Sequence, residues 1–369
     1  MTRLRVPFVS AALHEDAAAV RAAIDRVVAS GWFILGPEVE AFEREFATAA
    51  GARYAVGVGT GTDAIALALR ALGIGRGDEV ITTPLSAAYS ALAIVMTGAQ
   101  PVFADIDAAR LTIDPSAVEA AISHRTRAIV PVHLYGQPAD MAAIERVAAA
   151  HALAIVEDCC QAHLARSSGR PVGTIGAAGA FSFYPTKNLA ALGDGGAVVT
   201  DDAALAERIK RLRNGGQTDR YHHLELGVNT RLDEMQAAIL RARLPYLPRW
   251  TTRRRELAAE YRRLLSDAPV AIPPERDDGH VYHLFPVLVE GEADSRAALQ
   301  QHLRTSGIDT LIHYPVPIHR QPAFADLQPA DCPRADEACA HVLSLPLHSA
   351  LDHTAVAAVV EAICKRPLN

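Results

Sequence analysis

The stretch FSFYPTKNLAALGDGG, residues 181–196, places a lysine between an aromatic-rich run and a cluster of glycines. Lys187 follows closely on a run typical of a buried strand, so we expect it near the core. Burial disfavours the charged form of a lysine, and a neutral amine is a nucleophile that forms a Schiff base with an aldehyde. The alternative is a surface lysine whose charged end extends into water. The flanking residues favour the first interpretation: Phe181, Phe183 and Tyr184 precede the lysine, and Gly193, Gly195 and Gly196 permit close backbone approach after it.

Outward from this stretch, short β-rich runs alternate with helical ones. The patterns predict strands at 54–59, 78–84, 100–106, 127–134, 153–158, 179–184 and 196–200, and helices at 14–30, 36–51, 62–73 and 139–152. Such alternation is typical of a mostly parallel sheet covered by helices on both faces, and it predicts the α/β class.

The pattern changes after DEMQAAILRARLPYLPRW, residues 233–250. A long helical stretch (250–266) leads to a segment rich in proline and aspartate (268–279), and a strand-like run follows at 280–290. We therefore predict a large domain over residues 1–245 and a smaller one over residues 246–369.

Composition narrows the class of partner. The chain has 369 residues, half of them apolar, a formal charge of −6 and a pI near 6.2. Acidic and basic residues are interspersed, so nucleic acid is not expected as the main partner. The most basic run, Arg253–Arg255, is interpreted as part of the solvated face of a helix.

The cysteines and the N-terminus bear on the compartment. Five cysteines without C-x-x-C spacing argue against a disulfide framework and against a metal site of the zinc type. The N-terminal residues lack the apolar core of a signal peptide, and no apolar run approaches the length of a membrane span. We expect a cytoplasmic protein that does not bind membranes.

A carboxylate ends one of the predicted strands. Asp158 closes LAIVED (153–158), and ligands of open α/β sheets bind at the carboxyl ends of the strands. The neighbouring Glu157 points to the opposite side of the strand, so at most one of the two faces a given site. A plain cap of the strand end is the alternative interpretation of Asp158.

A glycine-rich turn opens a helix in VGVGTGTDAIALALRALG, residues 56–73. The free N–H groups and the positive end of such a helix bind anions. The spacing fits neither G-x-G-x-x-G nor a P-loop, and Thr60, Thr62 and Asp63 are also candidates for ordinary N-caps. An anion cradle, a strand-end carboxylate and a reactive lysine form the set that pyridoxal phosphate requires, since its phosphate, ring nitrogen and aldehyde need one of each.

Several motifs together resemble one family, the DegT/DnrJ/EryC1/StrS nucleotide-sugar aminotransferases, which are fold-type I enzymes using pyridoxal phosphate. The resemblance covers nearly the whole chain. It rests on GTGTDAIALALRALGIGRGDEVI (59–81), PVHLYGQPADM (131–141), VEDCCQAH (156–163), FSFYPTKNLAALGDGGAVVTDD (181–202) and GVNTRLDEMQAAIL (227–240). It implies a large domain with a mostly parallel seven-stranded sheet and a smaller C-terminal α+β domain.

The resemblance also implies roles for single residues. Lys187 would form the Schiff base, Asp158 would pair with the ring nitrogen, and Gln161 would lie beside the ring. The phosphate would be held by Gly61 and Thr62 through backbone N–H groups, by the Ser182 hydroxyl, and by Asn229 of the neighbouring subunit in a homodimer with shared active sites. The ring would stack on an aromatic from the segment after Pro84, where Tyr89 lies one or two residues beyond the usual position at Ala87 or Ala88.

The segments HYPVPIHRQPAF (313–324) and RYHHLELGVN (220–229) resemble the subgroup that acts on 3-keto-6-deoxyhexoses linked to a nucleoside diphosphate. Substrate-pocket roles are expected for His163, Tyr184, His222, His313, Tyr314 and His319; the alternative for the 313–324 residues is polar surface on a proline-rich turn. The implied reaction moves an amino group from an amino acid, glutamate in the first place, to C3 of the sugar, with pyridoxamine phosphate as the intermediate form of the cofactor.

Three other functions remain open from the sequence. One is an aminotransferase for a 4-keto nucleotide sugar or a keto-cyclitol. Another is a sugar dehydratase of the same fold, in whose relatives a histidine replaces the lysine that is present here as Lys187. The third is a binding or regulatory protein without catalytic activity.

Overall fold

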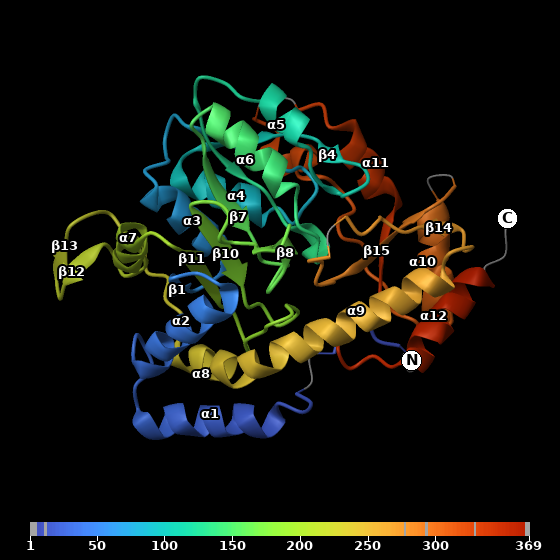
Figure 1. The fold of residues 1–369 in the computed structure, drawn as a ribbon, viewed down its shortest axis with the longest axis horizontal. Helices are drawn as coiled ribbons and strands as arrows, with labels where there is room; N and C mark the ends of the chain where they lie inside the picture. The colour runs from blue at the N-terminus through green and yellow to red at the C-terminus, as the bar shows by residue number, and fades with distance from the viewer. Residues whose placement is uncertain (1–5, 11–12, 277, 292–293, 328–329, 366–369) are drawn as a thin grey trace.

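The computed structural model describes residues 6–10, 13–276, 278–291, 294–327 and 330–365, arranged as Figure 1 shows. Within them, seven strands form one sheet in the order β1-β11-β10-β7-β6-β2-β3. The strands are β1 (Tyr54–Val58), β2 (Glu79–Thr82), β3 (Gln100–Phe103), β6 (Thr126–Val130), β7 (Ala154–Asp158), β10 (Ala178–Ser182) and β11 (Gly196–Thr200). Strands β10, β7, β6, β2 and β3 run parallel, and β11 is antiparallel to β10 and β1. The expected mostly parallel α/β sheet is confirmed.

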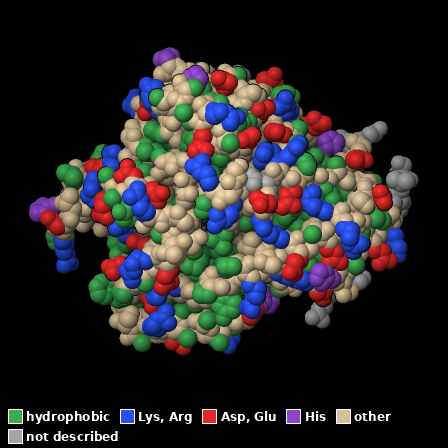
Figure 2. Space-filling view, viewed as in Figure 1, with side chains coloured by type: hydrophobic (Ala, Val, Ile, Leu, Met, Phe, Trp, Pro, Cys, Tyr) green, Lys and Arg blue, Asp and Glu red, His purple; other side chains and the backbone are tan. Residues whose placement is uncertain are grey.

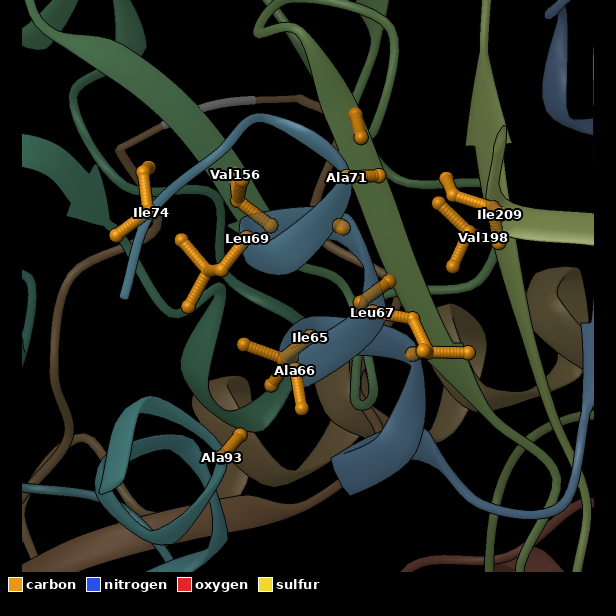
Figure 3. Close-up of a cluster of buried hydrophobic side chains, with 14 of the residues drawn as sticks. Ile65, Ala66, Leu67, Leu69, Ala71, Ile74, Ala93, Val156, Val198 and Ile209 are labelled. Carbon is orange, nitrogen blue, oxygen red and sulfur yellow. The ribbon is translucent and has the colours of Figure 1, made fainter. Parts of the chain in front are cut away.

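Helices cover both faces of this sheet, as alternating β and α patterns require. One face carries α3 (Gly61–Ala71), α4 (Tyr89–Thr97) and α7 (Ala203–Arg213). The other carries α2 (Pro37–Ala50), α5 (Pro115–Ala120), α6 (Met141–Ala150) and α8 (Glu234–Arg243). Figure 3 shows the core of the first face, where Leu67 and Leu69 of α3 point among side chains of the sheet.

Two contacts far apart in sequence fix the N-terminal part of the chain. Helix α1 (Ala17–Ser30) packs on α8. The buried carboxylate of Glu234 at the start of α8 accepts hydrogen bonds from the N–H groups of Gly36, Glu38 and Val39, at 2.8 to 2.9 Å. It thereby caps the N-terminus of α2, whose first N–H groups have no partner within the helix.

A second, three-stranded sheet lies in the C-terminal part, in the order β14 (Val270–Ala271), β15 (Phe285–Val289) and β16 (Val342–Leu345). With α9 (Leu247–Leu264), α10 (Ser295–Thr305) and α12 (His353–Cys364) it encloses a separate core that includes Leu257, Tyr261 and Phe285. Helix α11 (Pro333–His341) packs on β15. The boundary at residues 245 and 246 stays a prediction; α9 begins just beyond it.

The remaining elements are short. They are the strand pairs β4 (Ile106–Asp107) with β5 (Thr112–Ile113), β8 (Arg166–Ser167) with β9 (Arg170–Pro171), and β12 (Gln217–Asp219) with β13 (His222–His223), and the 3₁₀ turns η1 (Leu134–Gly136), η2 (Leu244–Tyr246), η3 (Ile318–Arg320) and η4 (Pro322–Phe324). The β12–β13 arm extends beyond α7 at the left of Figure 1. The predicted strand at 280–290 is shortened to β15, because residues 280–284 form a loop.

Charges of both signs are interspersed over the face seen in Figure 2. In the described ranges, no helix combines the length and the apolar character needed to cross a membrane.

Candidate active site

The site begins where β7 and β10 end side by side. These strands are parallel, and Asp158 pairs in register with Ala180. Because side chains alternate along a strand, Asp158 and Ser182 point to the same face of the sheet as Val156 and Ala180, which pack with α3. Asp158 is 5% exposed and accepts hydrogen bonds from the Ser90 hydroxyl (2.7 Å) and the Cys160 N–H (3.0 Å).

Glu157 points to the other face, as expected, and supports the structure there. Its carboxylate oxygens accept bonds from the N–H groups of Gly173, Ile175 and Gly176, each at 2.8 Å, and Glu157 Oε2 lies 3.1 Å from His133 Nε2. Cys159 completes a group of close metal-ligand types with these two side chains. The carboxylate is already saturated by these bonds, so we assign the group to holding the 173–176 loop.

The N-terminus of α3 lies beside the same strand ends. The Thr60 hydroxyl caps the helix by accepting a bond from the Asp63 N–H (3.0 Å). A Cβ atom on Gly61 would stand 2.7 Å from both Cys160 Sγ and Ser182 Cβ, so only glycine allows this close approach. The start of α3, with the N–H groups of Gly61 and Thr62, therefore lies against Ser182, and a helix start of this kind favours anions.

Lys187 lies in the loop after β10 and is half-buried. Burial lowers the pKa of its amine below the usual value, an effect that the nearby Cys160 and Asp158 side chains partly oppose. Asp158 ends β7 and Lys187 follows the neighbouring strand β10, so the two side chains lie near enough to interact electrostatically. The next residue, Asn188, anchors the loop by donating to the Val281 carbonyl (3.2 Å).

One wall of the site comes from the C-terminal part of the chain. Gln161 accepts a bond from the Tyr135 N–H (2.7 Å) and donates to the Tyr314 hydroxyl (3.1 Å). His313 bonds Ser344 Oγ (3.0 Å) and stacks on Phe8. Gln161, His313 and Tyr314, proposed separately from the sequence, thus lie together.

The buried histidines around the lysine are neutral. Burial, reinforced by the positive charge of Lys187, lowers the pKa of His163 to about 3 and that of His313 to about 4. The same causes hold the pKa of His283 well below its ordinary value. His163 itself packs against Phe181 and Phe183, on the side of the sheet that faces α2.

The other residues expected at the site, apart from His319, are open to solvent in the single chain. Tyr89, Tyr184, His222 and Asn229 are exposed. Tyr89 is 64% exposed at the start of α4, directly before Ser90, and Asn229 precedes Thr230, whose hydroxyl binds the Gly59 N–H (3.0 Å) beside the cradle. His319 packs near Phe103 and lies 3.4 Å from Asp336.

Sequence reasoning missed five residues of the site: Ser90, Cys160, Asn188, His283 and His348. Ser90 is on α4, a helix that the sequence pattern did not reveal. Cys160 and Asn188 adjoin predicted residues, so their proximity in sequence was the available signal. His283 is acted on by the charge of Lys187, and His348 lines a cavity together with Lys187; both come from loops of the C-terminal part, and only the fold places them here.

The interpretation of Arg253–Arg255 as a solvated face is wrong for Arg254. This guanidinium is 8% exposed, and its Nη1 donates to the carbonyls of Tyr282 (3.2 Å), His283 (3.2 Å) and Leu347 (2.9 Å). The backbone there leaves carbonyls pointing inward, which no local sequence pattern reveals.

Comparison with known proteins decides the family. The model of the DegT/DnrJ/EryC1/StrS aminotransferase family matches residues 14–364. The chain belongs to this family. The resemblance stated from the motifs, and with it an aminotransferase activity, is confirmed.

Relatives of this aminotransferase support the fold over its full length. The dTDP-3-amino-3,4,6-trideoxy-alpha-D-glucose transaminase of Streptomyces venezuelae is 50% identical, with 97% of this chain and 95% of the relative covered. The crystal structure of S. venezuelae DesV with a ketimine intermediate has a TM-score of 0.94 at 49% identity, covering 98% of each chain. NtdA of Bacillus subtilis with bound cofactor PMP has a TM-score of 0.91 at 30% identity, covering 98% of this chain and 85% of that one.

Proposed function

We propose that this aminotransferase moves an amino group from an amino acid, glutamate in the first place, to C3 of a nucleoside-diphosphate-linked keto-deoxysugar. The observation that carries the proposal is the shared site of Lys187, Asp158 and the N-terminus of α3 in a chain of this family. The similarity to a dTDP-3-amino sugar transaminase supports position C3.

We propose pyridoxal phosphate as the cofactor because the residues present fit each part of it. The N–H groups of Gly61 and Thr62 and the Ser182 hydroxyl would hold the phosphate, Asp158 the ring nitrogen, and Lys187 the aldehyde carbon. When bound, the cofactor supplies an electron-accepting ring and a carbon that carries the amino group between substrates. A relative with bound PMP supports this assignment.

The protein's own groups would then do three tasks. The Lys187 amine, whose pKa burial lowers, takes a proton from the substrate carbon and returns it, as a general base and then an acid. Asp158, held by a hydrogen bond from Ser90, would pair with the protonated ring nitrogen of the cofactor. Gln161 and Tyr314 orient the site wall through their hydrogen bond.

We propose that two copies complete each other's sites and that the chain divides into domains at 245/246. The β12–β13 arm and the segment after it expose Tyr221 (78%), Leu224 (68%) and Leu226 (89%), which a lone chain would leave in water. Asn229, at the base of this arm, would reach the phosphate of the neighbouring copy, and Tyr89, His222 and Tyr184 would be covered in the dimer.

The cysteines are free, with Cys364 exposed, which suits the reducing cytoplasm.

The test follows the cofactor through both halves of the reaction. The purified protein should be yellow, lose that absorbance with glutamate, and regain it with a 3-keto-6-deoxyhexose linked to dTDP, giving a 3-amino sugar by NMR. The Lys187→Ala variant should bind the cofactor yet lose turnover. An unchanged rate in that variant, or amination of a 4-keto sugar instead, would refute the assigned chemistry or the assigned position.

A further inference from the structure

A cavity of about 300 Å³ opens on Lys187 from the side of the N-terminal segment and α9. Its lining includes Asn188, Arg243, Arg254 and His348. None of the residues proposed to hold the cofactor lines this cavity except Lys187 itself. The cavity is thus separate from the proposed cofactor site, and Lys187 is the residue common to both.

The acids of this cavity are already neutralised. Asp16 pairs with Arg243 (2.8 Å), and Glu15 accepts from the indole of Trp250 (2.8 Å) and also pairs with Arg249. Among the salt bridges of the described residues, none includes Arg254 or Lys187. The cavity therefore carries uncompensated positive charge.

Arg254 is placed to use its charge. Its bonds to three backbone carbonyls all come from Nη1, and within the described part of the chain Nε and Nη2 make no hydrogen bond. Arginine stays charged at neutral pH even here, where burial lowers its pKa to about 10. A buried guanidinium with free N–H groups and no carboxylate partner is costly unless an anion completes it.

His348 is a second polar group in the same wall. It is 8% exposed, and among the described residues its ring has no side-chain partner in good hydrogen-bond geometry, although the Pro7 backbone lies close to it. It adjoins Leu347, whose carbonyl binds Arg254. A neutral imidazole beside a guanidinium adds one further donor to an oxygen ligand.

We propose that Arg254, assisted by His348, binds a carboxylate of the amino-acid donor. This inference rests on the proposed transamination, because the donor must bring its amine to the place of Lys187 and carries a carboxylate next to that amine. An arginine fork matches a carboxylate with two parallel bonds. The volume is at the low end of ligand sites, which suits an amino acid better than a nucleotide diphosphate.

The test separates the donor from the sugar nucleotide. Binding of glutarate, a dicarboxylate without an amine, is measured by calorimetry on the cofactor-loaded protein for wild type and Arg254→Gln. We expect the dissociation constant to rise at least about 30-fold, as when one partner of a buried charged contact is lost. The rate constant of the single-turnover half-reaction with glutamate should fall by a similar factor. The rate constant for the pyridoxamine form with the keto sugar should change less than about threefold.

The neighbouring arginine gives a matched control. Arg255 also binds a backbone carbonyl, that of His280 (2.8 Å), but is exposed and does not line the cavity. Arg255→Gln should leave glutarate binding unchanged. Should Arg254→Gln fail to fold, Arg254→Lys keeps the charge but not the fork, and at least a tenfold loss of glutarate affinity is expected.

Three results would overturn the proposal: unchanged glutarate binding in both variants, a loss confined to the sugar half-reaction, or an equal loss in both halves accompanied by a lower melting temperature. The second would indicate that the cavity binds the diphosphate of the sugar nucleotide. The third would mean that Arg254 only stabilises the two loops whose carbonyls it binds. If glutarate binds as expected while no amino acid bleaches the wild-type protein, the proposed transamination fails and the anion site stands.

Discussion

Asp158 and Lys187 illustrate how single side chains are prepared for a reaction by opposite environments. The carboxylate is buried and accepts two hydrogen bonds, from the Ser90 hydroxyl and the Cys160 N–H. The amine is buried without a hydrogen-bonded partner for its side chain among the described residues, and burial favours its neutral form. A hydrogen-bonded carboxylate and an amine whose pKa is lowered by burial suit proton transfer beside a cationic ring.

Removing the charge at residue 158 tests this arrangement. Asp158→Asn keeps the shape but not the charge, so the rate constant of the glutamate half-reaction should fall by hundreds-fold, as for loss of one well-placed electrostatic contact. Ser90→Ala leaves the charge and removes one bond to it, so a decrease of about tenfold is expected. Stopped-flow absorbance measures both, with circular dichroism as the check on folding. Equal rates in Asp158→Asn and wild type would contradict the role of the carboxylate.

Whole elements matter through their ends. Helix α3 is buried along its length, but its function is expected at the first turn, where Gly61 meets Cys160 and Ser182. For the β12–β13 arm, the exposed apolar side chains on and after it are expected to matter, because they would form contacts with a second copy of the chain.

A methyl group at the start of α3 should displace the anion cradle. Gly61→Ala places a Cβ 2.7 Å from two neighbouring atoms, and overpacking of this kind costs about 1–3 kcal/mol. We expect the dissociation constant for pyridoxal phosphate, measured by absorbance titration, to rise at least about tenfold. Adding Cys160→Ala removes one of the two contacts and should restore part of the affinity, since touching residues are not additive. No recovery in the double variant would argue that the helix start does not move as a unit with Cys160.

A charge on the arm should separate the copies. Leu226 is 89% exposed, so Leu226→Asp does not disturb the core of the single chain. In sedimentation velocity the wild type should be a dimer, and the variant should be mostly monomer with weaker cofactor binding, because Asn229 is then withdrawn from the neighbouring site. Arg304→Glu, on the exposed surface of α10, changes charge elsewhere and should remain dimeric. A monomeric wild type would refute the shared site.

How much of this could be foreseen differs between the sheet and the site. Strands such as β7 and β11 were predictable because they are short apolar runs, and Lys187, Asp158 and Gly61 because they end or begin such elements. The antiparallel direction of β11 was not, since direction depends on how the chain returns and leaves no mark in a five-residue run. Arg254 and His348 were missed because their partners are backbone groups and cavities assembled from distant loops.

Across the whole molecule, buried histidines couple folding to acidity. Burial lowers the pKa of His163 and His280 to about 3, and that of His283 well below its ordinary value. The unfolded chain binds protons at these groups below about pH 6.5, and the folded chain does not. Stability is therefore fully present above that pH and is lost as the pH falls toward 3.

Denaturant unfolding of the cofactor-free protein between pH 7.5 and pH 5 should show this loss. Each of the three histidines adds up to about 1.4 kcal/mol per pH unit once its unfolded form is protonated. His163→Phe, placed among Phe181 and Phe183, should lower the slope by about one proton while keeping the packing. A slope that stays the same in this variant would mean that His163 takes up a proton without unfolding.

The position of β1 in the sheet has a consequence for how the protein is made. Among the described residues its one neighbour in the large sheet is β11, so the strand at residues 54–58 leaves the ribosome long before residues 196–200 exist to pair with it. At ordinary rates of translation the interval is on the order of ten seconds. The cap that Glu234 gives to α2 is delayed even further. During that interval the N-terminal third of the nascent chain carries an unpaired strand that is prone to aggregation. The yield of folded protein in the cell should therefore depend on chaperones that bind such segments during synthesis.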